Sequence, residues 1–312
     1  MDVFAVAGGD GAGKTTTALN LAVALRDAGS YAAILDADLS GNVSSALDVS
    51  YAATLEAVVD GDARARDAVG DVELSTDSLP ESDLAAYNKA LAADRTQFRA
   101  GAAQEEPSTD EDEPDIDTLP VVAGFENRAD HTGTDPETLA DVLENFVMAY
   151  DVLVVDTGNG PASQSPTIDI ADGTITVATP DPAKMEAARE DVRACTSAGT
   201  KLMGCVVNRA GEKTSISEVT DSVGAEAFGV IPEDARTAAL EPVFFSVPGS
   251  PAANAYGRLA DKALSWDGAS ALVGQTSADG GDDPDPTSGR DESDGTDDDD
   301  SGGFLSGLLG DD

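Results

Sequence analysis

The sequence predicts an α/β fold whose doubly wound, mostly parallel sheet carries helices on both faces. Three observations predict it. Short apolar runs of strand length recur through residues 1–264, amphipathic stretches separate them, and polar or glycine-rich turns follow several of the runs. Strands that alternate with helices in this way build parallel sheets. A chain of 312 residues has room for one large domain or two ordinary ones.

The first unit carries the most specific motif. An apolar strand over Val3–Ala7 leads into Gly8–Thr15, which fits the pattern G-x-x-x-x-G-K-[ST], and a helix follows over Thr15–Gly29. In this order the loop amides and the helix N-terminus converge on phosphate groups. The alternative is a glycine-rich turn that holds no ligand. The nucleotide-binding residues predicted from the loop are Gly9, Asp10, Gly11, Ala12, Gly13, Lys14, Thr15 and Thr16.

Two later strands end in aspartates. Tyr31–Leu35 runs into Asp36 and Asp38, and the apolar strand Asp151–Asp156 ends in Asp156. Ligands of open parallel sheets bind at the carboxyl ends of the strands. The Thr15 hydroxyl and the Asp156 carboxylate are the metal-binding residues for Mg²⁺ that these motifs predict. Capping of the next helix is the alternative role for the first aspartate pair.

The order of these motifs resembles the MinD/ParA group of P-loop ATPases. The residues that carry the resemblance are D-x-D-x-x-G-N from Asp36 to Asn42, the pair Asn208-Arg209 after the strand 202–208, and the loop 231–234. The resemblance covers most of residues 1–264 and implies the P-loop NTPase fold. The acid-rich composition makes the chain similar to haloarchaeal members of the group.

The resemblance implies specific roles. Asp38 helps order the attacking water and the Mg²⁺ shell, and Asp36 supports the metal site, so both are implied metal-binding residues. The implied catalytic residues are Lys14 and Asp38. Asn208 hydrogen-bonds the adenine edge. The further implied nucleotide-binding residues are Arg209, Pro232, Glu233 and Asp234. The strand 174–178 and the helix after it form the dimer and partner face in this group, which implies a homodimer.

The loop departs from the group in one important place. Members carry a signature lysine that reaches across the dimer to the partner's phosphates, and Gly9 stands at that position here, followed by Asp10. No other lysine lies nearby in the sequence. The turn after Asp156 also differs from the group's Pro-Ala-Gly. The string at 8–16 is similar to thymidylate kinases, although an arginine-rich lid is missing.

Composition narrows the choice of partners. The net charge is −42, from 60 acidic and 18 basic residues spread along the chain, which is typical of proteins that remain soluble in concentrated salt. A dedicated acidic surface for a partner is the alternative. Because no Lys/Arg stripe is present, we expect no nucleic-acid binding. Residues 1–20 do not form a signal peptide, and no apolar run is long enough to span a membrane.

The remaining elements are simpler. Cys195 and Cys205 lack metal or paired-thiol spacing and are predicted to pack as apolar side chains in a reducing cytoplasm. The further predicted elements are a short helix within 51–69, a helix within 84–99, a strand over 119–124, a helix over 136–150, a helix over 219–227, a strand over 228–234 and a closing helix over 248–264.

The predicted organisation is a nucleotide-binding domain over 1–266, interrupted by an acidic insertion at about 70–117. A disordered acidic linker follows over 267–302, and a short apolar motif ends the chain at 303–312. The motif lacks basic residues and contains three glycines. Docking to a protein groove, weak membrane contact and no role are the alternatives.

The functional hypothesis is an ATP- and Mg²⁺-dependent switch that positions cellular components from the cytoplasm, the membrane surface or the cell pole. We expect it to act as a Mg²⁺-dependent ATPase. The first alternative is a nucleotide-binding scaffold without turnover. The second is a nucleoside monophosphate kinase, which would explain residues 8–16 alone.

Overall fold

The computed structural model describes residues 2–38, 42–74, 118–125, 134–147, 149–158, 166–234, 242–269 and 271–272. All of them lie in one compact unit, Met1–Gln275. The predicted helix within 84–99, nearly all of the insertion at 70–117, most of the linker and the motif at 303–312 fall outside the described residues.

The described strands form one eight-stranded sheet in the order β3-β4-β2-β5-β1-β6-β7-β8. Every pairing is parallel except that of β3 with β4, so the α/β fold with a mostly parallel sheet is confirmed. The strands are β1 (Asp2–Gly8), β2 (Ala32–Asp36), β3 (Val69–Glu73), β4 (Thr118–Val122), β5 (Val152–Asp156), β6 (Gly173–Ala178), β7 (Leu202–Ala210) and β8 (Ala227–Pro232).

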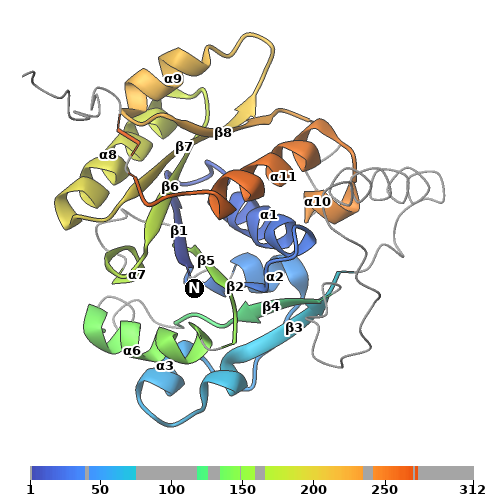
Figure 1. The fold of residues 1–312 in the computed structure, drawn as a ribbon, viewed down its shortest axis with the longest axis vertical. Coiled ribbons are helices and arrows are strands. Elements are labelled where there is room, and N and C mark those ends of the chain that lie inside the picture. Colours follow the sequence, from blue (N-terminus) through green and yellow to red (C-terminus); the bar gives the residue numbers. More distant parts are fainter. Residues whose placement is uncertain are drawn as a thin grey trace, which may run out of the picture. The chain divides into compact units, whose positions relative to one another are not determined.

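Helices cover both faces of the sheet (Figure 1). One face packs against α1 (Lys14–Asp27), α2 (Asn42–Leu47), α10 (Val243–Ser246) and α11 (Pro251–Leu264). The other face packs against α3 (Leu55–Val59), α6 (Pro136–Val147), α7 (Pro166–Asp169), α8 (Pro182–Ala198) and α9 (Ile216–Val223). Because both faces are covered, the central strands are apolar at nearly every position, as the sequence pattern predicts.

The sequence misplaces several boundaries. Residues 69–73 form β3, an antiparallel edge strand, although 70–73 was assigned to the insertion. The helix predicted over 219–227 begins at Ile216 and ends at Val223, where Gly224 adopts a left-handed conformation. The helices predicted over 136–150 and 248–264 span 136–147 and 251–264. The short helices α2, α7 and α10 were not predicted.

The chain also remains part of the fold beyond residue 266. Ala271 donates its N–H to the Leu202 carbonyl at 2.9 Å and accepts the Glu226 N–H at 2.9 Å. Leu272 forms an isolated antiparallel bridge with Ala225. The first residues of the predicted linker are therefore hydrogen-bonded to the start of β7 and to the residues just before β8.

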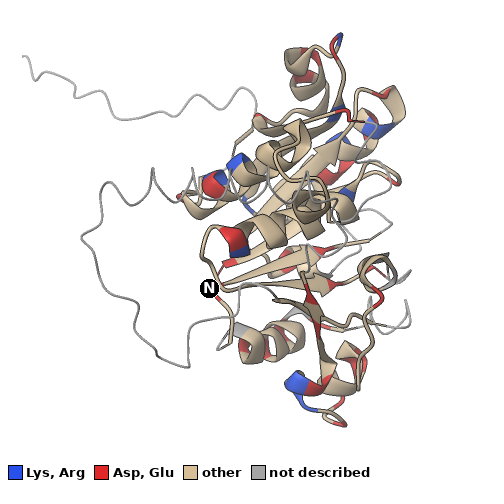
Figure 2. Cartoon of the chain, turned by 90° about the vertical axis from the view of Figure 1, so that its right-hand side faces the viewer, with Lys and Arg blue, Asp and Glu red and all other residues tan. Residues whose placement is uncertain are grey.

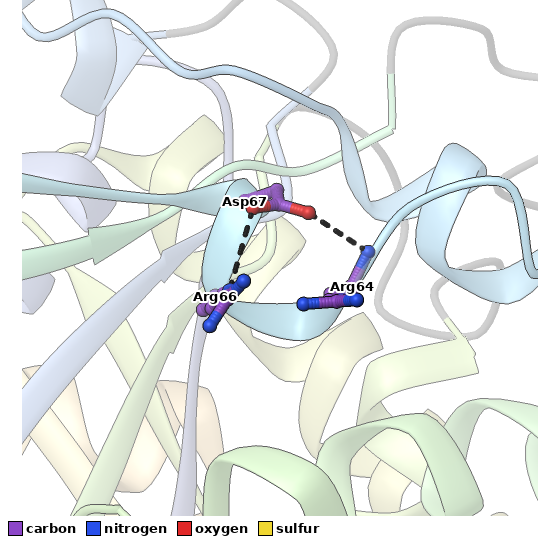
Figure 3. A network of polar contacts seen from close by, with 3 residues as sticks. All are labelled: Arg64, Arg66 and Asp67. Carbon is purple, nitrogen blue, oxygen red and sulfur yellow. Dashed lines mark hydrogen bonds and ion pairs between the residues drawn. The ribbon is translucent and has the colours of Figure 1, made fainter.

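A 3₁₀ turn, Ala65–Ala68, leads into β3 (Figure 3). The Asp67 carboxylate accepts the Arg64 backbone N–H at 3.2 Å and lies 3.7 Å from Arg66 Nε. Because the side chains of Arg66 and Asp67 are exposed, their ion pair contributes little to stability. The hydrogen bond from the Arg64 backbone N–H to the Asp67 carboxylate is the contact that closes the turn.

Acidic residues are spread over many helices and loops of the described chain, with few basic residues among them (Figure 2). Within the described ranges, no helix combines the length and apolar character that crossing a bilayer requires. Both cysteines are free and buried, and burial raises the pKa of Cys195 to about 11 and that of Cys205 to about 12. They pack as apolar residues, as predicted.

Helix α11 provides a test of the packing. Leu259 is buried in the core, where it contacts β8 at Gly229, whereas Leu264 on the same helix is 47% exposed. We expect Leu259→Ala to lower the free energy of unfolding by about 2–5 kcal/mol, because it leaves a cavity. Leu264→Ala is the matched control, with an expected change below about 0.5 kcal/mol. Urea unfolding followed by circular dichroism measures both, and equal losses would contradict this packing.

Candidate functional site

The loop between β1 and α1 has the backbone of an anion-binding site. Gly11 and Gly13 take left-handed conformations, with φ of 68° and 97°, and the Ala12 N–H donates to the Gly9 carbonyl at 3.0 Å. Helix α1 begins without a side-chain cap and without an acidic residue in its first turn. Its N-terminal amides and the positive end of its dipole therefore favour a bound anion.

Lys14 lies at the start of α1 and is buried. Its Nζ donates to the Gly9 carbonyl at 3.3 Å. Burial lowers the pKa of this ammonium, while Asp156, Asp10, Asp191 and Asp38 act in the opposite direction. The ammonium is therefore surrounded by carboxylates, and it lies within the loop where phosphates would bind.

Two carboxylates meet at the ends of adjacent strands. In the register of β2 and β5, Asp36 pairs with Asp156, and both side chains are buried. Asp36 Oδ2 accepts the Ser44 N–H at 2.9 Å and the Ser44 hydroxyl at 2.5 Å, and that hydroxyl lies 2.8 Å from the Tyr51 hydroxyl. Asp36 Oδ1 and Asp156 Oδ2 have no hydrogen-bond partner. Such orphaned oxygens are costly to bury and mark a place for a ligand.

Asp156 has the most strongly shifted pKa of the site. Its pKa is raised to about 7, mainly by burial and also by the charges of Asp36 and Asp38. Hydrogen bonds from the Thr15 hydroxyl and the Gly158 amide act in the opposite direction. Thr15 at the start of α1 and Asp156 at the end of β5 therefore meet, as their positions at the same edge of the sheet predict.

Asp38 packs directly against the chain that leaves β5. A Cβ added to Gly158 would lie 2.7 Å from Asp38 Cβ and 2.8 Å from Asp38 Cγ, and Gly158 has a φ of 71°. Only glycine fits this position without strain. The loop after β2 and the turn after β5 are thus in contact.

The donor set fits Mg²⁺ better than a metal held by protein groups alone. Among the described residues, no three His, Cys, Asp or Glu side chains are close enough to form a cage for an ion. Mg²⁺ keeps several waters and commonly binds one or two protein oxygens together with substrate phosphates. The Thr15 hydroxyl and the orphaned oxygen of Asp156 suit this mode.

On the other side of the loop, the end of β7 supports the backbone. The Asn208 amide donates to the Ala12 carbonyl at 2.9 Å, and its oxygen accepts the Arg209 N–H at 2.8 Å. A Cβ on Gly13 would collide with the same amide. Arg209 has a φ of 53° and donates from Nη1 to the Gly11 carbonyl at 3.3 Å. Asn208 thus contacts the loop itself, and its contact with adenine stays a prediction.

The end of β8 lies beside the end of β7. Ala210 pairs with Pro232, and the Glu233 N–H donates to the Ala210 carbonyl at 3.1 Å. The loop that begins at Pro232 is therefore adjacent to Asn208-Arg209, as the predicted base-binding region requires.

One basic residue at the site was missed in the sequence. Lys184, in the first turn of α8, donates from Nζ to the Asp10 carbonyl, although the two residues are far apart in the sequence. Its position follows from the sheet order, because β6 ends beside β1 and α8 begins directly after β6. A search limited to lysines near the loop in sequence could not find it.

The fold and this site define the class of the protein: it is an α/β protein with a P-loop at the carboxyl end of a central parallel strand. The family is defined by comparison with known sequences. Residues 3–241 match the CobQ/CobB/MinD/ParA nucleotide binding domain. The chain belongs to this family.

The individual proteins that the chain resembles share only a moderate part of its sequence. Two uncharacterized ATP-binding proteins of Methanocaldococcus jannaschii are each 27% identical to the chain. The first aligns over 272 residues, which are 84% of this chain and 87% of the relative. The second aligns over 271 residues, 83% of this chain and 86% of the relative.

Two solved structures share the fold. The first is the septum site-determining protein MinD of Pyrococcus horikoshii, complexed with Mg-ADP, which has a TM-score of 0.60 and a sequence identity of 23%. The alignment covers 84% of this chain and 95% of the MinD chain. The cell division ATPase MinD of Pyrococcus furiosus has a TM-score of 0.60 at 22% identity, with coverage of 84% and 98%.

The shifted pKa of Asp156 makes stability depend on pH. Its pKa of about 7 in the folded chain lies above the ordinary value of 3.8, so the folded state binds the proton more tightly than the unfolded state does. The stability that this proton contributes is present below about pH 4 and is lost as the pH rises through about 7. In EDTA without nucleotide, we expect Asp156→Asn to raise the free energy of unfolding at pH 8 by about 1–4 kcal/mol.

The expected difference between Asp156→Asn and the unchanged protein shrinks as the pH falls toward 4, where both forms are neutral. Asp221→Asn removes the same charge from an exposed position on α9 and serves as the control. Chemical unfolding at a series of pH values measures the difference. A gain that is the same at pH 4 and pH 8 would contradict the buried carboxylate as its cause.

Proposed function

We propose that the protein binds ATP with Mg²⁺ and hydrolyses it. The observation that carries this proposal is the meeting of Lys14, Thr15 and Asp156 at the carboxyl end of β1, where one carboxylate oxygen of Asp156 is buried without a partner. Similar proteins support it, because two of them are described as ATP-binding proteins and the structure of a third was solved with Mg-ADP.

In this proposal each residue has a definite task. Lys14 and the N-terminal amides of α1 bind the phosphates and offset their charge. Thr15 and Asp156 hold Mg²⁺, which would neutralise charge on the phosphates and fix their orientation. Asp36, anchored by Ser44, supports that site from the neighbouring strand. Asp38 orders the water that attacks the terminal phosphate.

Adenine is proposed to bind beside the ends of β7 and β8. The adjacency of Asn208-Arg209 to Pro232-Glu233 supports this position. Asn208 already donates one N–H to the loop, and its amide group carries a second donor. The base would therefore lie against a group that also holds the phosphate loop in place.

The biological role proposed is a positioning switch, in which the nucleotide state sets contacts between two copies of the chain or with a partner protein. A relative of the same fold is named as a septum site-determining protein, and another was solved as a MinC:MinD complex. The acidic linker and the apolar motif at 303–312 would then tether the nucleotide-binding domain to a partner. A binding scaffold without turnover is the second candidate, favoured by the glycine at position 9.

Binding is tested first. We expect Lys14→Ala to raise the Kd for a fluorescent ATP analogue by about 100-fold or more, because the variant loses charge-assisted hydrogen bonds worth about 1.5–3 kcal/mol each. Lys201→Ala removes an exposed lysine at the opposite, amino end of the sheet and is the matched control. Equal affinity of the Lys14→Ala variant and the unchanged protein would refute the site assignment.

Hydrolysis is tested next, in molar KCl with Mg²⁺. We expect Asp38→Ala to lower the rate by roughly 100-fold or more, since ordering the attacking water contributes that much. Its Kd for ATP should change less than about threefold. Asp60→Ala, which changes an exposed residue directly after α3, is the control. If the unchanged protein bound ATP tightly without hydrolysing it, the binding scaffold would be the remaining candidate function. Phosphate transfer to a nucleoside monophosphate would show that the protein is a nucleoside monophosphate kinase.

A further inference from the structure

The loop between β1 and α1 is covered from outside by helix α8. This helix begins directly after β6, which pairs with β1 in parallel, so that its first turn lies beside the loop. The Asp181 carboxylate caps α8 by accepting the N–H groups of Ala183 at 3.0 Å and Lys184 at 3.2 Å. Pro182 follows at the first helical position. This cap fixes the backbone position of Lys184 beside the loop.

Gly9 leaves room for this helix. A Cβ at position 9 would lie 2.7 Å from the Ala187 Cβ, closer than such atoms approach in proteins, and 3.8 Å from Lys184 Cα and Cδ. Any side chain at position 9 would therefore push α8 away. A lysine at position 9 and helix α8 in its present place over the loop are therefore sterically incompatible.

The Lys184 ammonium lies over the outer part of the same loop. Its Nζ donates to the Asp10 carbonyl and lies 3.4 Å from the place that a Cβ of Gly11 would occupy. Lys14 donates to the Gly9 carbonyl from within the loop, and Arg209 donates to the Gly11 carbonyl from the end of β7. Three consecutive carbonyl oxygens of the loop thus each receive a hydrogen bond from a basic side chain.

This gathering of positive charge is unusual for the chain. Only 18 of its residues are Lys or Arg, against 60 Asp and Glu, and Asp10 adds a carboxylate beside the loop. A neutral carbonyl needs no ammonium partner, whereas a triphosphate needs several positive groups to offset its charge. An ammonium also carries three donors, and the bond to Asp10 uses one of them.

We propose that Lys184 is a second phosphate-binding lysine, which α8 of the same chain supplies to the nucleotide bound at its own loop. On binding, its ammonium contacts phosphate oxygens from the side opposite to Lys14. This proposal rests on the proposed binding of ATP. In this proposal, the positive charge that a lysine at position 9 would bring is supplied instead by Lys184, from helix α8 of the same chain.

The test compares three variants of the full chain by their Kd for ATP and for inorganic tripolyphosphate. We expect Lys184→Gln, which retains a donor for the Asp10 carbonyl but removes the charge, to raise both Kd values by about 10–100-fold. Lys184→Arg, which retains the charge, should stay within about threefold of the unchanged protein. Arg193→Gln removes a charge from an exposed position on the same helix and should leave both Kd values unchanged.

The variants separate charge from support of the loop. If Lys184 only held the Asp10 carbonyl, Lys184→Gln would bind both probes within about twofold of the unchanged protein, and that result would overturn the proposal. If the unchanged protein bound tripolyphosphate in a Lys184-dependent way but did not bind ATP, the role of Lys184 would be supported and the proposed binding of ATP would be refuted. If it bound neither tripolyphosphate nor ATP, both proposals would be refuted.

A second measurement needs no variant. The half-buried Lys184 and the exposed Lys213 of the unchanged protein are acetylated briefly, with and without tripolyphosphate, and quantified by mass spectrometry. We expect saturating tripolyphosphate to slow the modification of Lys184 at least fivefold, while that of Lys213 is unchanged. An unchanged rate at Lys184, with Lys14 protected, would contradict the proposal.

Discussion

Neighbouring segments approach the loop between β1 and α1 more closely than any side chain would permit, and this close approach determines the rest of the site. Ala187 of α8 fills the space beside Gly9, and the Asn208 amide fills the space beside Gly13. The loop is therefore held between the end of β7, which provides Asn208, and helix α8, which provides Ala187. A backbone fixed in this way can present its amides to a ligand without reorganising first.

Charge at the site is separated according to the chemistry of the proposed ligand. The basic groups of Lys14, Lys184 and Arg209 all reach the loop, where phosphates would bind. The carboxylates of Asp36 and Asp156 lie together at the ends of β2 and β5, where a metal ion would bind. Both carboxylates are buried, and burial raises the pKa of each, so that a cation bound there would remove an unfavourable arrangement.

The sequence was most reliable for elements whose local pattern is strong. Parallel strands such as β1, β5 and β6 are mainly apolar and buried at nearly every position, and they were predicted to within a residue or two at each end. The edge strand β3 was missed because an antiparallel edge is only half buried, which leaves its residues without a continuous apolar pattern. Helices of four to six residues, such as α2 and α10, carry too few residues to show a period.

By itself, the sequence determined most of the succession of strands and helices along the chain, the P-loop, and the aspartates that end β2 and β5, because each is encoded in a short local stretch. Only the tertiary structure decided what lies beside the loop. Lys184 and Gly9 are distant in the chain, and they become neighbours because β6 pairs with β1 and α8 then crosses the loop. Strand order in a parallel sheet is set by packing among all the elements, so no local pattern records it.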